Sequence, residues 1–203
     1  MPDKTHTVPL SLMNAVYSKS AVHRITALWA LSEAALGGVL HALRIPFTGL
    51  FVGSSAVIFI TLIAFFARQK GAIFRATLIV MIVKGLVSPH TPVTAYFAVT
   101  FQGILGELLF RHARRFALPA LLLGVFSLLQ CALQKIFILT LVFGKTLWAS
   151  IDMLGQYILG QLSLLPVSIQ SIPVSFWLIG VYVFVHLLAG FLSGLFAGRI
   201  PAW

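Results

Sequence analysis

Acidic side chains are scarce in this sequence. Four of its 203 residues are aspartate or glutamate, and charged residues make up 9% of the chain, whereas an ordinary soluble domain carries about 25%. The sequence has no H-E-x-x-H motif and no pair of aspartates spaced to hold a magnesium–phosphate complex. Gly144-Lys145-Thr146 looks like the end of a phosphate-binding loop, but Leu139 stands where that loop requires its first glycine. We therefore expect no catalytic residues and no hydrolysis of ATP by the chain itself.

Cysteine occurs once, and histidine forms no local cluster. Cys131 has no partner for an internal disulfide, and its position in an apolar run indicates a small core residue. A metal site would have to be assembled from His41, His90 and Glu33 in distant segments, and no ligand spacing in the sequence supports one. We expect neither a metal nor a cofactor.

Long hydrophobic runs dominate what is present. Hydrophobic residues make up 60% of the chain, and the mean hydropathy is +1.03, which is typical of an integral membrane protein. With about 20 residues for each crossing, prolines and glycines divide the chain into apolar segments at about 25–43, 50–67, 73–87, 93–110, 117–143 and 174–197. The predicted fold class is an all-α integral membrane protein with six transmembrane helices. Residues 1–24 are expected to form a tail, and residues 25–203 a single membrane domain.

Residues 144–173 differ from these six segments. Apolar side chains repeat there at helical spacing beside polar ones, at Leu147, Ile151, Leu154, Ile158 and Leu162. We expect an amphipathic segment that lies in the membrane interface or caps a site. In the last apolar segment, Gly190, Gly194 and Gly198 recur every four residues, a spacing that lets membrane helices pack closely.

The distribution of positive charge predicts the orientation. If both ends of a six-helix chain are cytoplasmic, that side holds Lys4, Lys19, Arg24, Arg68, Lys70, Arg75, Arg111, Arg114, Arg115 and Arg199. The outer side then holds only Arg44 and Lys145. This bias agrees with the positive-inside rule, so we expect an inner-membrane protein with cytoplasmic termini and the 144–173 segment outside. The same rule accounts for the net charge of +10, and we expect no binding to nucleic acid.

Polar side chains collect in the outer parts of the predicted helices. The stretch from Lys84 to Arg111 turns at Pro89 and Pro92, and its polar residues continue from that turn into apolar surroundings, where unpartnered polar groups are costly. The candidate substrate-binding residues are Lys84, His90, Tyr96, Gln102, Gln134, Lys135 and His41. Several have a structural alternative, in which the lysines snorkel to the headgroups, Tyr96 is an interfacial aromatic, Gln134 bonds a neighbouring helix and His90 is a solvated loop residue.

Two carboxylates fall within the predicted helices. Glu107 precedes Arg111 by four residues, the spacing of a local ion pair on a helix, and we expect that pairing. Glu33 lies near the middle of the first predicted helix with no basic residue nearby in sequence. Glu33 must therefore be protonated, hydrated or paired with another helix, and Lys84 is one candidate partner.

The first predicted helix contains a short motif and is followed by a loop. Ala30 and Ala34 form an A-x-x-x-A pattern, and Pro46-Phe47-Thr48-Gly49 comes after the helix. In these pieces, and in length and predicted topology, the chain resembles the substrate-binding (S) components of energy-coupling factor transporters. The resemblance implies that Ala30 and Ala34 dock on a coupling permease and that the loop gates the pocket. It further implies capture of a vitamin-like small molecule from outside, with ATP used only by partner ABC-type ATPases.

Other functions fit the same sequence. Lys84, Lys135 and Arg44 favour an anionic substrate for a capture subunit. A solitary secondary carrier would instead use Glu33 to couple protons, and it would suit a homodimer packed through the glycines of the last helix. A membrane assembly factor with no substrate is a third class, and an intramembrane enzyme is the least favoured.

Overall fold

The computed structural model describes residues 10–36, 39, 47–67, 69–88, 91–113, 115–162 and 173–200. These residues are helical apart from short connections, and no strand occurs among them. The elements are α1 (Leu10–Leu31), the π-helix η1 (Ser32–Leu36), α3 (Thr48–Phe66), α4 (Ala72–Val87), α5 (Val93–Phe110), α6 (Ala117–Leu162) and α8 (Val174–Arg199). The prediction of an all-α chain is confirmed for the part that the structure describes.

The observed helix boundaries follow the predicted ones closely, except at the first helix. α4 ends at Val87 and α5 begins at Val93, as the prolines between them require. The first helix begins at Leu10 rather than near Ile25, and its predicted end at Leu43 lies outside the described residues. Among the described helices, α3, α5, α6 and α8 are long and apolar enough to cross a membrane. The chain is thus shown to be a helical protein with four candidate membrane spans.

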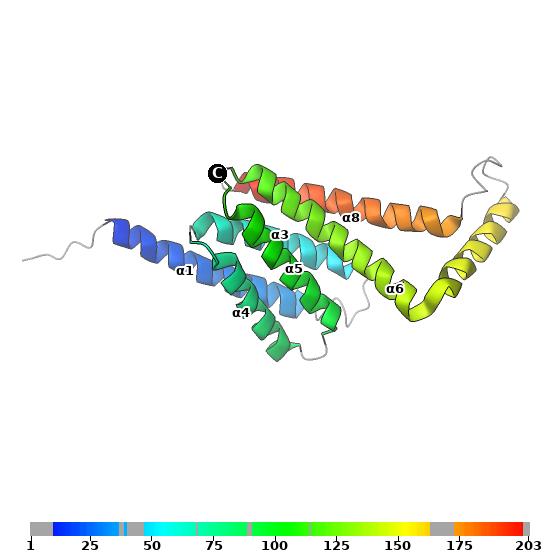
Figure 1. Cartoon of the computed structure of the whole chain (residues 1–203), viewed down its shortest axis with the longest axis horizontal. Coiled ribbons are helices and arrows are strands. Elements are labelled where there is room, and N and C mark those ends of the chain that lie inside the picture. The colour runs from blue at the N-terminus through cyan, green and yellow to red at the C-terminus, as the bar shows by residue number, and fades with distance from the viewer. Residues whose placement is uncertain are drawn as a thin grey trace, which may run out of the picture.

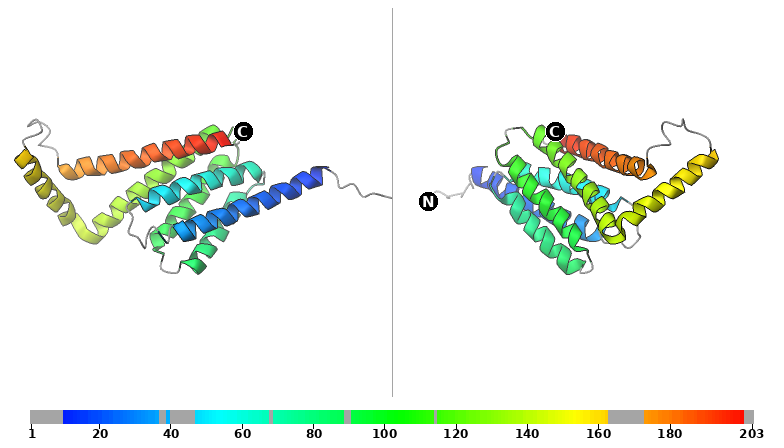
Figure 2. Two further views of the ribbon diagram at one scale, coloured as in Figure 1. Left: turned by 180° about the vertical axis from the view of Figure 1, so that it is seen from behind. Right: turned by 45° about the vertical axis from the view of Figure 1, so that its right-hand side comes forward.

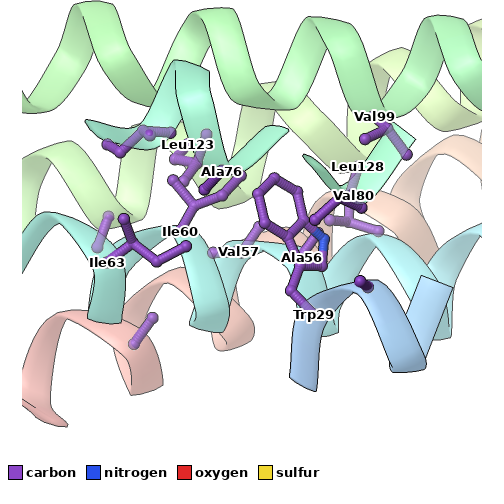
Figure 3. Close-up of a cluster of buried hydrophobic side chains, with 14 residues drawn as sticks. Trp29, Ala56, Val57, Ile60, Ile63, Ala76, Val80, Val99, Leu123 and Leu128 are labelled. Carbon is purple, nitrogen blue, oxygen red and sulfur yellow. The ribbon is translucent and has the colours of Figure 1, made fainter. Parts of the chain in front are cut away.

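The helices pack around α3, which lies in the middle of the bundle. α3 contacts α1, α5, α6 and α8, and α6 and α8 run side by side in opposite directions over much of their lengths (Figures 1 and 2). The core lies between α3 and its neighbours (Figure 3). Trp29 of α1 meets Val57 of α3 there, and Val80 of α4 and Leu128 of α6 belong to the same buried cluster. Many large apolar side chains on the outside of the bundle are exposed, as expected of a surface that faces lipid.

Glycines allow α6 and α8 to approach at backbone distance. A Cβ built on Gly190 would lie 2.6 Å from the carbonyl oxygen of Gly124, and one on Gly194 would lie 2.7 Å from the carbonyl oxygen of Ala120. Gly198 faces Ala117 in the same way, at 2.9 Å from its Cα. The glycines singled out in the sequence therefore lie inside the chain's own α6–α8 interface, and that face is occupied.

α6 is bent at Gly144. This residue has φ 70° and ψ −169°, a combination that only glycine adopts readily. The break falls where the sequence predicted the end of the apolar segment, and the amphipathic stretch after it is helical to Leu162. The second part of α6 turns back toward the start of α8 (Figure 1), and Gly155 lies against Val174, where an added Cβ would be 2.5 Å from a methyl carbon.

Asp152 fastens this second part of α6 to α8. Its Oδ1 accepts a hydrogen bond from the Ser175 N–H at 2.7 Å, and its Oδ2 accepts one from the Ser175 hydroxyl at 3.0 Å. The free N–H groups in the first turn of a helix need acceptors, and a carboxylate there also interacts favourably with the helix dipole. A side chain distant in sequence thus supplies a cap that α8 lacks from its own N-cap, Pro173.

We expect Asp152→Ala to lower the free energy of unfolding by about 1–2 kcal/mol, because it removes this cap. Hydrogen exchange should quicken first at the start of α8, around Ser175. The control is Ser150→Ala, a change at an exposed residue of the same helical segment, which should leave exchange in α8 unchanged. Equal exchange in Asp152→Ala and in the unaltered protein would show that the cap does not hold the two helices together.

Glu107 has a capping role rather than the predicted pairing. Its Oε1 accepts the N–H of Gly71 at 2.6 Å, and its Oε2 accepts the N–H of Phe74 at 3.3 Å. Between the described side chains the ion pair is Lys84–Glu33, and Glu107 makes none with Arg111. The predicted local pair is therefore wrong, because the start of α4 offers unsatisfied N–H groups to the carboxylate, while an exposed pair with Arg111 would contribute little.

Candidate functional site

A cavity of about 810 Å³ lies between the helices of the bundle and is partly open to the outside. Its wall is formed by the beginnings of α3 and α5, the middle of α6 and the first half of α8, together with one side chain each from η1 and α4. The size is typical of a site for a small organic molecule. Most of the lining is apolar, and the polar groups are few enough to be considered one by one.

Glu33 and Lys84 form a buried ion pair in the cavity wall. Lys84 Nζ donates to Glu33 Oε2 at 2.6 Å, and the two side chains are 5% and 1% exposed. Glu33 lies on η1, and a π-helical turn within a helix often marks a functional position. The sequence named Lys84 as a candidate partner for Glu33, and the structure bears this out. The alternative in which Lys84 snorkels to the headgroups is wrong, because its ammonium group points inward to a carboxylate.

Gln102 brings a buried amide to the cavity. It is 2% exposed, and its Oε1 has no hydrogen-bond partner among the described residues. Its Nε2 lies 4.0 Å from Cys131 Sγ, a weak contact, and a Cβ on Gly53 would lie 3.4 Å from that nitrogen. Buried polar atoms are nearly always paired, so an unpaired amide oxygen on a cavity wall is the group most in need of a ligand.

Gln134 and Lys135 are the next polar groups along α6. Gln134 Nε2 donates to the Thr94 carbonyl at 2.6 Å, and its Oε1 accepts from Gln130 Nε2 at 2.6 Å. Gln134 therefore lines the cavity and also bonds a neighbouring helix, so the substrate-binding and structural roles predicted for it are compatible. Lys135 lines the cavity as well but is exposed, and no carboxylate of the described residues pairs with it. The alternative in which Lys135 snorkels to the headgroups stays a prediction.

Aromatic side chains form another part of the wall. Phe47 belongs to the loop that the resemblance assigned to gating the pocket, whereas the sequence did not reveal Trp148, Tyr182 or His186 as part of a site. The ring of Tyr182 lies 5.6 Å from that of Phe47 in a stacked arrangement and 4.3 Å from that of His186. His186 Nδ1 and the Tyr182 carbonyl are 2.9 Å apart. Trp148 also lines the cavity, and its Nε1 donates to Thr140 Oγ1 at 3.0 Å across the bend in α6. Tyr182 and His186 are four residues apart, but only the tertiary fold brings Phe47 to them and Trp148 to the same cavity.

The remaining predicted residues fall elsewhere. Tyr96 does not line the cavity, and its hydroxyl lies 3.4 Å from the position of a Cβ on Gly85 of α4. His41 and His90 lie outside the described residues. Ala30 and Ala34 are 3% and 4% exposed, so in this arrangement their side chains pack inside the chain and offer no docking surface.

The described residues give no indication of a metal centre. Among them no group of three or more histidine, cysteine, aspartate or glutamate side chains is placed to hold a metal ion. Glu33 is instead paired with a lysine, which competes with any cation for its oxygens. The buried amide and the aromatic side chains of the lining suit an organic molecule that makes hydrogen bonds and aromatic contacts.

Comparisons with known proteins found no relative of this chain. No protein-family model, no curated protein and no solved structure matches the chain. The function must therefore be argued from the cavity itself. The chain is a helical protein with four candidate membrane spans and a cavity between its helices, lined by a buried ion pair, a buried amide and aromatic side chains.

Proposed function

We propose that this protein captures a small molecule within the membrane, as the substrate-binding subunit of an importer whose ATPases are separate chains. The observation that carries the proposal is the cavity of about 810 Å³ into which Gln102, Gln134, Lys135 and the Glu33–Lys84 pair converge. The resemblance in length and predicted topology to S components of energy-coupling factor transporters supports the same function. Neither a nucleotide nor a cofactor is part of the proposed site.

The cost of placing polar groups in such a bundle supports a binding function. Ionisable and amide side chains among membrane helices are expensive, and they are usually found where a substrate or ion passes. In a purely structural bundle, the Glu33–Lys84 pair could be replaced by apolar side chains without loss of stability. The buried Gln102 amide is stronger support for a binding function, because its oxygen has no hydrogen-bond partner among the described residues.

The proposed topology has six crossings with both termini cytoplasmic. On α4 and α8 the cavity residues lie in the half remote from Arg75 and Arg199. On α5 they reach only to Gln102 in the middle of the helix, away from Arg111, and on α6 they begin at Cys131, several turns beyond Arg115. If those cations face the cytoplasm, as the positive-inside rule expects, the cavity is on the outer side of an inner membrane. That is the side from which an importer takes its substrate.

The buried ion pair favours a second candidate function. A solitary carrier that couples transport to protons needs a titratable carboxylate at its substrate site, and Glu33 lies in the cavity wall. In that case uptake should depend on a proton gradient, and Glu33→Gln should abolish the dependence. Uptake that requires partner ATPases, and that does not respond to the gradient, would exclude the carrier.

Native mass spectrometry of the protein, gently extracted from its own host, tests the proposed function. We expect a co-purified small molecule in a complex of one ligand per chain, or coupling and ATPase subunits bound to the chain. Gln102→Leu should reduce ligand occupancy by about tenfold or more, since it removes the hydrogen-bonding amide and keeps the side-chain volume. Gln156→Leu, at an exposed position outside the cavity, is the matched control and should retain the ligand.

The outcomes separate the functions considered. If the chain is purified without a ligand and without partner subunits, and uptake is driven by protons, the protein is the solitary carrier and not a capture subunit. An empty chain without partners and without any uptake would leave a membrane assembly factor. Ligand bound equally in Gln102→Leu and in the unaltered protein would place the binding site away from this cavity.

A further inference from the structure

We propose that the cavity takes a flat ring system with one hydrogen-bond-donating edge and a single anionic group at its opposite end. This inference rests on the proposed function, and it names the chemical class of the substrate. Four features of the cavity support it: the net charge of its lining, the unpaired Gln102 amide oxygen, the aromatic side chains and the spacing of residues along α6.

The charge balance of the cavity leaves one positive charge. Its described lining holds the carboxylate of Glu33 and the ammonium groups of Lys84 and Lys135. Glu33 and Lys84 neutralise one another at 2.6 Å. Lys135 has no carboxylate partner among the described residues, and a ligand with one negative charge would complete the balance. Lys135 is itself exposed, so the anionic group of a ligand can reach its ammonium group, whereas a cation would be repelled by it.

The unpaired oxygen of the Gln102 amide favours a ligand that carries a hydrogen-bond donor. Its Oε1 is buried and without a partner in the described structure. Its Nε2 has only the weak contact with Cys131 Sγ. An amide offers an acceptor and a donor side by side, so a ring with an N–H next to a carbonyl group would satisfy both. A plain hydrocarbon ring would leave the oxygen unpaired, and the site would discriminate against it.

The aromatic part of the cavity wall suits a flat ring. Phe47, Tyr182, His186 and Trp148 present aromatic surface to the cavity. Aromatic side chains pack favourably against other rings in offset-stacked or edge-to-face arrangements. A branched aliphatic ligand would gain burial there but none of this preference.

The spacing along α6 sets the length of the ligand. Cys131 marks the level of the Gln102 amide, and Lys135 lies one helical turn further along, about 6 Å at a rise of 1.5 Å per residue. The donor edge and the anionic group must therefore lie at different ends of the molecule.

Three related compounds test this assignment on the full chain in detergent micelles, with binding measured by calorimetry. Pterin-6-carboxylate has the flat ring, the N–H edge and the distant carboxylate; pterin lacks the carboxylate, and 2-naphthoate lacks the N–H edge. We expect pterin-6-carboxylate to bind at least about tenfold more tightly than either of the others. Lys135→Met should remove its advantage over pterin, and Gln102→Leu should remove its advantage over 2-naphthoate.

Matched variants outside the cavity control these changes. Lys145→Met and Gln156→Leu alter exposed residues of α6 that do not line the cavity, and they should leave all three affinities unchanged. Equal or tighter binding of pterin overturns the anionic assignment, and equal or tighter binding of 2-naphthoate overturns the donor edge. If none of the three binds at about 1 mM, the ligand class is wrong, whereas the capture function stands or falls separately on the molecule that co-purifies from the host.

Discussion

Lys84→Met is expected to lower the free energy of unfolding by about 3–5 kcal/mol, because it leaves the Glu33 carboxylate buried without a partner. The methionine keeps most of the volume of the lysine stem, so lost packing is a minor part of the effect. Chemical denaturation of the purified protein in detergent micelles would measure the change. Glu33→Leu should cost a similar amount, since it leaves the ammonium group alone.

The double variant Glu33→Leu/Lys84→Met distinguishes an ion pair from a simple loss of contacts. Apolar side chains of similar volume often replace a buried pair with no net loss of stability, so we expect the double variant to recover most of the free energy lost in either single variant. Lys70→Met, at an exposed lysine with no carboxylate partner in the described structure, should change stability very little. Losses that simply add in the double variant would contradict the coupling inferred here.

Gly124→Ala is expected to destabilise the protein by about 3 kcal/mol, at the upper end of the usual range for overpacking. The added methyl group would lie 2.2 Å from the carbonyl oxygen of Gly190. That obstacle is backbone in the middle of a helix, so it cannot move aside as the tip of a flexible side chain can. The α6–α8 interface would have to open along much of its length, and thermal unfolding in micelles would report the loss.

Gly180→Ala is the matched control for this change. Gly180 lies in α8 as well, and nothing surrounds the position of its Cβ within 4 Å. Alanine there should be neutral, or stabilising by up to about 1 kcal/mol through its higher helix propensity. Equal losses in the two variants would mean that any glycine in these helices is needed, and that close approach of α6 and α8 is not the reason.

Several features of the fold could be predicted because they depend on neighbouring residues. The prolines after Val87 end one helix and begin the next, and Gly144 falls at the change from an apolar to an amphipathic pattern. Lys84 could be predicted as a partner of Glu33 because a charge in an apolar segment needs an opposite charge nearby. Gln102 and Lys135 entered the predicted site by the same argument, and both line the cavity.

Other features could not be predicted because they depend on which faces meet. The spacing of Ala30 and Ala34 is the same whether they face a partner protein or the chain's own core, and the structure turns them inward. Glu107 was assigned to Arg111 by helical spacing, but the N–H groups of Gly71 and Phe74 come to it through the packing of α4 on α5. Phe47 is far from Tyr182 in sequence, and its backbone has a positive φ of 66°, which no pattern in the sequence signals.

The bend at Gly144 determines whether the length of α6 fits the thickness of a bilayer. A straight helix of 46 residues would be about 69 Å long, more than twice the hydrocarbon thickness of about 30 Å. An unbroken α6 would project its second part, which carries Leu154, Tyr157 and Ile158, far into water. The reversal instead returns that part to the beginning of α8. A single achiral residue thereby keeps the apolar length of the molecule compatible with the thickness of one membrane.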